Sequence, residues 1–263
     1  MVTAALRAYH EANRYFDIFD EEGLRGKKAH IENVIAMAEA IAVGQHSMVD
    51  KELLKILAEH HDDGRVDQFK LLGKFWDSER SHNELGAERI DSFLKEKNLQ
   101  EDEQVRMMKN VILYHGRQEK EEGLDEKTME YIEIITAADD FENACACVSY
   151  LVTEADTDAK GYRKKYPSAD QKVFLEFVWE HFVSGEKYDK SVYCHTYAEY
   201  TLFAATLATM CIKRYGSLAK TALMQPGYGY TSSLDGFRVV FERLLKPDDA
   251  ARAYKLLSEM IEA

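Results

Sequence analysis

Potential chemistry is concentrated in residues 57–65, where the sequence reads Leu-Ala-Glu-His-His-Asp-Asp-Gly-Arg. His61 and Asp62 end an apolar run with helical spacing, and they offer one nitrogen and one oxygen ligand to a divalent ion. Two ligands do not hold a metal, so further donors must come from elsewhere in the chain. Candidates lie on, or at the end of, other segments with helical apolar spacing: His30, His82, His115 and Asp139.

This order of a histidine, a His-Asp dyad, two further histidines and a late aspartate resembles the HD superfamily of metal-dependent phosphohydrolases. The likeness is closest to a bacterial branch in which the dyad continues as His-Asp-x-Gly-Arg-x-x-Gln, here His61 to Gln68. A segment like Gly-x-Phe-x-Asp-x-x-Ser-x-His follows, here Gly73 to His82, and the resemblance spans residues 26–145. The chain departs from the family pattern at four positions: Glu59, His60 and Asp63, where apolar residues are usual, and Gly116, where an asparagine is usual.

The resemblance implies a divalent ion with water in its open positions, held by His30, His61, Asp62 and Asp139. The two remaining histidines, His82 and His115, either bind a second ion with Asp62 as the bridging ligand or stay free. A free pair would supply a general acid for the leaving oxygen and a donor to the phosphoryl group. Mixed histidine and carboxylate ligation suits Mn, Fe, Co, Ni or Zn better than Ca, so we expect one or two such ions per chain.

Arg65 and Gln68 are spaced to project together from the turn after the dyad. An arginine can bind two phosphate oxygens at once, so we expect this pair to bind the substrate. The alternative is a surface arginine that caps the preceding helix.

Three further residues with possible donor atoms lie next to the expected ligands. His60 is not expected to bind the metal, because adjacent helical positions point about 100° apart. Asp63 and Asp140 are alternates to the aspartates that precede them, and either could instead orient a ligating imidazole.

The composition favours an all-α fold, since the chain has only 3 prolines and is rich in helix-forming residues. We expect an HD-domain helical bundle over residues 1–155, which carries the metal site, and a C-terminal helical extension over residues 156–263 that packs on it. Helices are expected at about residues 3–20, 26–43, 50–61, 83–97, 101–115, 125–153, 173–183, 193–212 and 237–261, the last interrupted at Pro247.

The segments between these helices carry two further expectations. A lid-like loop is expected after the dyad, containing Gly64, Gly73 and the pair Phe75-Trp76. The polar segment 153–169 is the expected linker, and a turn is expected at residues 226–230.

The charge and the apolar pattern limit the partners. A formal charge of −13, from 47 acidic and 34 basic residues, repels polyanions and argues against duplex nucleic acid as a ligand. No apolar run is long enough for a membrane span, and the 4 cysteines have no disulfide spacing, so we expect a cytoplasmic protein. The sequence leaves open whether the chain forms a homo-oligomer. Four aromatic residues at helical spacing suit packing either in the core or at a dimer interface: Tyr193, Tyr197, Tyr200 and Phe203.

The resemblance implies an enzyme, a metal-dependent phosphohydrolase that hydrolyses a phosphoester of a small phosphorylated metabolite, with a nucleotide as the favoured substrate. One alternative is a binuclear phosphodiesterase that acts on a cyclic or bridged dinucleotide. A second alternative is a non-catalytic metal-binding regulatory protein, with residues 170–263 as the partner surface.

Overall fold

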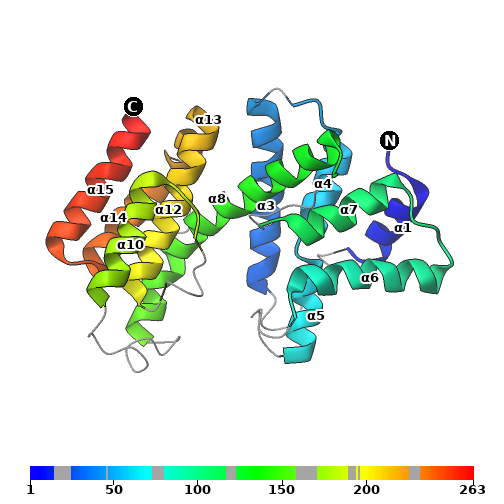
Figure 1. Ribbon diagram of the computed structural model, residues 1–263, viewed down its shortest axis with the longest axis horizontal. Helices are drawn as coiled ribbons and strands as arrows, with labels where there is room; N and C mark the ends of the chain where they lie inside the picture. The colour runs from blue at the N-terminus through cyan, green and yellow to red at the C-terminus, as the bar shows by residue number, and fades with distance from the viewer. Residues whose placement is uncertain are drawn as a thin grey trace. The chain divides into compact units, whose positions relative to one another are not determined.

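A computed structural model describes most of the chain, in these ranges: residues 1–14, 25–45, 47–72, 80–116, 123–157, 171–188, 194, 196–224 and 232–263. The described residues form helices joined by short links, with no strand among them, which confirms the all-α expectation (Figure 1). They divide into two compact units, residues 1–139 and residues 140–263, here called unit 1 and unit 2. The division lies within α8, Glu126–Thr157, whereas the sequence suggested a boundary after residue 155.

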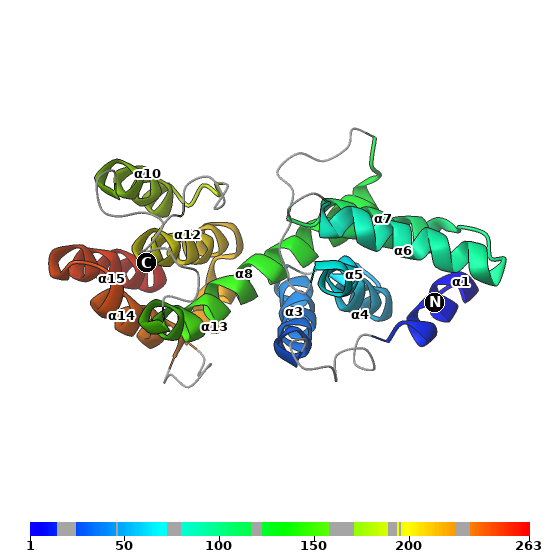
Figure 2. The ribbon, with the colours of Figure 1, turned by 90° about the horizontal axis from the view of Figure 1, so that it is seen from below.

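Unit 1 is a bundle of helices, most of which lie within a few residues of the expected positions. The first helix ends at Ala12 instead of near residue 20, and the helix at residues 63–72 was not expected. It contains α1 (Ala4–Ala12), α3 (Arg25–Gly44), α4 (Lys51–His60), α5 (Asp63–Leu72), α6 (His82–Lys97), α7 (Glu103–Tyr114) and the first part of α8. In both ribbon views α6 and α7 lie side by side, and α5 packs against α6 (Figure 2).

The prediction of a loop directly after the dyad was wrong for residues 63–72, which form the helix α5. Asp63 in the first turn suits the positive end of the helix dipole, and Val66 and Gln68 are buried. Gly64 therefore lies in a helix, while Gly73 and the pair Phe75-Trp76 lie outside the described residues.

Unit 2 is built around α12, which contacts the helices α10, α13, α14 and α15. The helices that follow α8 are α10 (Gln171–Ser184), α12 (Tyr197–Tyr215), α13 (Ser217–Met224), α14 (Ser233–Leu244) and α15 (Pro247–Glu262). The expected interruption at Pro247 is confirmed, since this proline begins α15, where its missing N–H costs nothing. The aromatic residues Tyr197, Tyr200 and Phe203 are buried within the unit, so they are core residues, while Tyr193 lies outside the described residues.

Two expectations about connecting segments fall partly or wholly outside the described residues. The expected linker at 153–169 begins as helix, because α8 continues to Thr157, and the rest of it is not described. The expected turn at 226–230 is also not described. Within the described part of the chain, none of the helices combines the length and the hydropathy of a membrane span.

Capped helix ends position the dyad and its partner histidines. The Asp50 side chain accepts from the backbone N–H groups of Glu52 and Leu53 and so begins α4, and His61 is the residue at the other end of that helix. Ser81 caps α6 directly before His82, and His115 ends α7. Helix ends of α4, α6 and α7 thus carry the candidate donors, where backbone geometry fixes their direction.

The contact between α5 and α6 leaves no room for a side chain. A Cβ atom on Gly64 would overlap the backbone carbonyl oxygen of His82, and a Cβ on Gly86 would lie 2.7 Å from Cγ2 of Ile112. Gly64 is therefore required for α5 and α6 to approach, and Gly86 leaves space for Ile112 of α7; the approach at Gly64 sets the position of His82.

We expect Gly64→Ala to lower the free energy of unfolding by about 3 kcal/mol, because α5 and α6 must separate to admit the methyl group. Urea denaturation followed by circular dichroism measures this change. Lys95→Ala, at an exposed position of α6, is the control and should change stability by less than about 0.5 kcal/mol. Equal stability of the two variants would contradict the close approach.

Candidate metal centre

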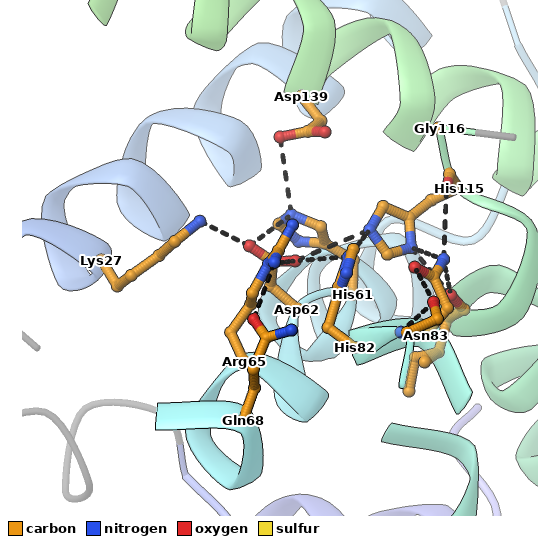
Figure 3. Close-up of polar contacts among 12 residues, drawn as sticks. Lys27, His61, Asp62, Arg65, Gln68, His82, Asn83, His115, Gly116 and Asp139 are labelled. Atoms are coloured by element: carbon orange, nitrogen blue, oxygen red, sulfur yellow. Dashed lines mark hydrogen bonds and ion pairs between the residues drawn. The ribbon is translucent and has the colours of Figure 1, made fainter. Parts of the chain in front are cut away.

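The six candidate ligands meet in unit 1, although they are spread over residues 30–139 (Figure 3). They come from different elements: His30 from α3, His61 and Asp62 from the link between α4 and α5, His82 from the start of α6, His115 from the end of α7, and Asp139 from α8. All except His82 and Asp139 are buried, and those two are partly buried.

Four of these residues form what we call the first donor group: His30, His61, Asp62 and Asp139. The Nε2 atom of His30 lies 3.3 Å from Oδ1 of Asp139 and 3.8 Å from Oδ2 of Asp62. The Nε2 atom of His61 lies 3.8 Å from the same Asp139 oxygen and 3.9 Å from the same Asp62 oxygen. Metal bonds of about 2.0 to 2.2 Å place adjacent ligand atoms about 3 Å apart and opposite ones about 4 Å apart, so each of these four distances is compatible with a shared ion. His30, His61 and Asp62 offer atoms that all lie within 4.8 Å of one another, and Asp139 does so with His61 and His115.

A second donor group shares Asp62 with the first. The Oδ1 atom of Asp62 lies 3.4 Å from Nε2 of His82 and 3.6 Å from Nε2 of His115, and the two nitrogens are 3.4 Å apart. Asp62 therefore presents one carboxylate oxygen to each group (Figure 3). This is the arrangement that a bridging carboxylate between two ions requires.

The hydrogen bonds of two imidazoles prepare them as ligands. Nδ1 of His61 donates to the backbone carbonyl of Ala58 at 2.7 Å, and Nδ1 of His115 donates to the carbonyl of Ile112 at 2.9 Å. A carbonyl can only accept, so in the neutral ring the lone pair is on Nε2, which faces the donor groups. Nε2 of His61 is buried and makes no hydrogen bond among the described residues, which fits a divalent transition metal as its partner.

Positive groups hold both carboxylates ionised. Burial alone would raise the pKa of Asp62. The Nζ atom of Lys27, 2.6 Å from Oδ2, and the neighbouring histidines, His61 first among them, act in the opposite direction and outweigh burial. The pKa of Asp62 therefore lies well below its usual range. Burial likewise opposes ionisation of Asp139, but the neighbouring imidazoles of His30 and His61, whose Nε2 atoms lie 3.3 and 3.8 Å from Oδ1, bring its pKa well below the usual range. Both aspartates are thus available as anionic ligands at neutral pH.

The structure also places Arg65 and Gln68 beside the dyad, from the first turns of α5. Nη1 of Arg65 donates to Oε1 of Gln68 at 2.8 Å, and Nε of Arg65 lies 3.7 Å from Oδ1 of Asp62 (Figure 3). The two side chains project together, as expected, but from a helix instead of a turn.

Lys27 and Asn83 are two neighbours of the centre that the sequence did not single out. Lys27 precedes His30 by three residues on α3, a spacing that places both on one face and could have indicated its role. Nδ2 of Asn83 donates to the carbonyls of Ile112 at 2.7 Å and His115 at 3.3 Å, and so ties the end of α7 to the start of α6. Nothing in the sequence pattern distinguished Asn83 from other polar residues near a helix start.

The alternates take other roles. Asp63 accepts a hydrogen bond from the Tyr9 hydroxyl at 2.6 Å and lies 3.0 Å from Nδ1 of His60, so neither His60 nor Asp63 belongs to a donor group. Asp140 accepts from Nζ of Lys187 at 2.7 Å.

A surface hollow of about 380 Å³ contains none of the candidate ligands and is lined by Asn13, Asp67, Leu85, Glu88, Arg89, Ser92, Phe93 and Glu96.

Acidification tests the ion pairs around Asp62. Because the folded-state pKa of Asp62 is depressed, these ion pairs stabilise the fold fully above the unfolded value of about 3.9, and the contribution is lost as the pH falls through the folded-state pKa. We expect the free energy of unfolding of the metal-free protein to fall as the pH drops below about 4, less steeply in Asp62→Asn. Urea titrations at stepped pH measure both slopes, and identical slopes would contradict the ion pairs.

The chain was compared with known proteins in three ways. No protein-family model, no curated protein sequence and no solved structure matches it. The chemistry of the centre is therefore inferred from the chain's own donor atoms.

Proposed function

We propose that this chain is a metal-dependent phosphohydrolase of the HD superfamily, acting on a small phosphorylated metabolite with a nucleotide as the favoured substrate. The observation that carries the proposal is Asp62, a buried carboxylate that faces a donor group with each of its oxygens and has basic side chains beside it. A structural metal would need the donors but not the adjacent Lys27 and Arg65.

The residues of the first donor group, His30, His61, Asp62 and Asp139, would hold the ion. A divalent ion bound there would lower the pKa of a bound water and supply hydroxide for in-line attack on phosphorus. In a chain with a single ion, His82 and His115 would not bind metal; one would donate a proton to the leaving oxygen and the other a hydrogen bond to the phosphoryl group.

The charges of the centre support an anionic substrate. Lys27 and Arg65 both lie beside Asp62 and carry two positive charges, which an incoming phosphate can use once an ion has neutralised the carboxylate. The overall charge of −13 still opposes polyanions, so a small phosphorylated molecule suits the centre better than a nucleic acid.

A second candidate function is a binuclear phosphodiesterase that acts on a cyclic or bridged dinucleotide. The observation that favours it is the second donor group, in which Asp62, His82 and His115 are separated by 3.4 to 3.6 Å. Two ions bridged by Asp62 would bind both the attacking and the leaving oxygen of a diester.

We expect Asp62→Asn to reduce hydrolysis about 100-fold or more, because the amide removes the anionic oxygen shared by both groups. Initial rates on nucleoside monophosphates, cyclic dinucleotides and bis(p-nitrophenyl) phosphate measure the loss. Asp91→Asn, an exposed aspartate paired with Lys109, is the matched control and should keep full activity. Hydrolysis by Asp62→Asn at the rate of the control would overturn the proposal, and a variant that loses stability without any wild-type hydrolysis would favour a regulatory protein.

Counting ions separates the two enzyme functions. We expect His82→Gln to contain one transition-metal ion fewer per chain than the wild type, since it removes a ligand from the second donor group only. Elemental analysis of protein purified without chelator or histidine tag gives the count, with His181→Gln in unit 2 as the control. An unchanged count in His82→Gln would leave His82 as a general acid and favour a phosphomonoesterase.

A further inference from the structure

A separate cluster of donor atoms lies between α1 and the last turn of α4. Nδ1 of His10 is 3.1 Å from Nε2 of His60 and 3.9 Å from Oε2 of Glu59. These three donor atoms all lie within 4.8 Å of one another and share no residue with the two groups around Asp62. Their spacing is in the range found for the first donor group.

Hydrogen bonding orients His60 toward His10. Nδ1 of His60 lies 3.0 and 3.1 Å from the two carboxylate oxygens of Asp63, which can only accept, so Nδ1 carries a proton. Asp63 also accepts from the Tyr9 hydroxyl at 2.6 Å. A carboxylate behind an imidazole is the usual support of a metal-binding histidine, because it fixes the ring and makes the other nitrogen a better donor.

The cluster is largely buried. His60 is fully buried and Glu59 is only 3% exposed, so a cation bound to this carboxylate would offset part of its desolvation. The His10 side chain is 22% exposed, which leaves an approach from solvent.

We propose that His10, Glu59 and His60 form a further metal site, apart from the two donor groups around Asp62, which binds a zinc-type divalent ion and fastens α1 to α4. Two imidazole nitrogens and one carboxylate oxygen are a ligand set of zinc, and a water completes the tetrahedron. The ion takes the place of the hydrogen bond between Nε2 of His60 and Nδ1 of His10, which are 3.1 Å apart. The proton of that bond leaves Nδ1, and the His10 ring carries its proton on Nε2 instead, so that both facing nitrogens offer a lone pair to the ion.

The site also accounts for three of the four departures from the HD pattern. Glu59 and His60 are ligands, and Asp63 supports His60. These three polar residues do not recur at a helical spacing, but they lie in the same environment, which they share with Tyr9 and His10 of α1.

A matched pair of variants at His10 tests the site. Asparagine and aspartate both place an atom close to the position of Nδ1, but only the carboxylate is a good zinc ligand. We expect His10→Asn to bind one zinc ion fewer per chain than the wild type, and His10→Asp to bind the wild-type number. Competition titration of the metal-free full-length protein against a chromophoric chelator measures the number of tight sites.

The controls keep the outcome readable. Circular dichroism of each metal-free variant checks that it is folded, and His181→Asn in unit 2 should bind the wild-type number of ions. Asp62→Asn, which affects only the donor groups around Asp62, should keep the His10 site, so that the two proposals fail separately. An equal zinc number in wild type and folded His10→Asn would overturn the proposal and leave a hydrogen-bonded histidine pair.

Discussion

A buried carboxylate has to be surrounded by groups that compensate its charge, and the arrangement of unit 1 follows from this requirement at Asp62. Four helices supply the groups that compensate this charge. Lys27 and His30 come from α3, Arg65 from α5, His82 from the start of α6 and His115 from the end of α7. Removing any one of these helices would leave an anion in the interior with part of its stabilisation missing. The bundle and the candidate centre are thus held by the same contacts.

The consecutive residues His60 and His61 divide the chemistry of the bundle. Both are fully buried at the end of α4, yet His61 faces Asp62 and Asp139, while His60 faces His10 and Asp63. Adjacent helical residues differ in direction by about 100°, so a pair of histidines can serve two separate clusters without competing for one. The same turn of helix therefore connects the proposed catalytic centre with the proposed structural ion.

The sequence predicted most of the helices from their apolar periodicity. The six candidate ligands were chosen from their order along the chain, which resembles the HD pattern, and Asp139 also from its place in an apolar helical stretch. The structure brings Asp62 and Asp139, and not Asp63 and Asp140, close to the candidate histidines. The helix at residues 63–72 was missed, because Gly64 favours a loop locally and only the close approach of α6 makes a glycine suitable there. The contact of His10 with α4 joins residues 50 positions apart, and local periodicity carries no information about such contacts.

The crossing of α5 and α6 makes backbone clearance part of the chemistry. Gly64 has no donor atom, but the carbonyl of His82 occupies the space that any side chain at residue 64 would need. A mutational scan that selects for hydrolysis would therefore score Gly64 together with the histidines, and a comparison of side-chain chemistry alone would not explain why. The candidate metal centre therefore depends on Gly64, a residue that contributes no donor atom and matters only because it has no side chain.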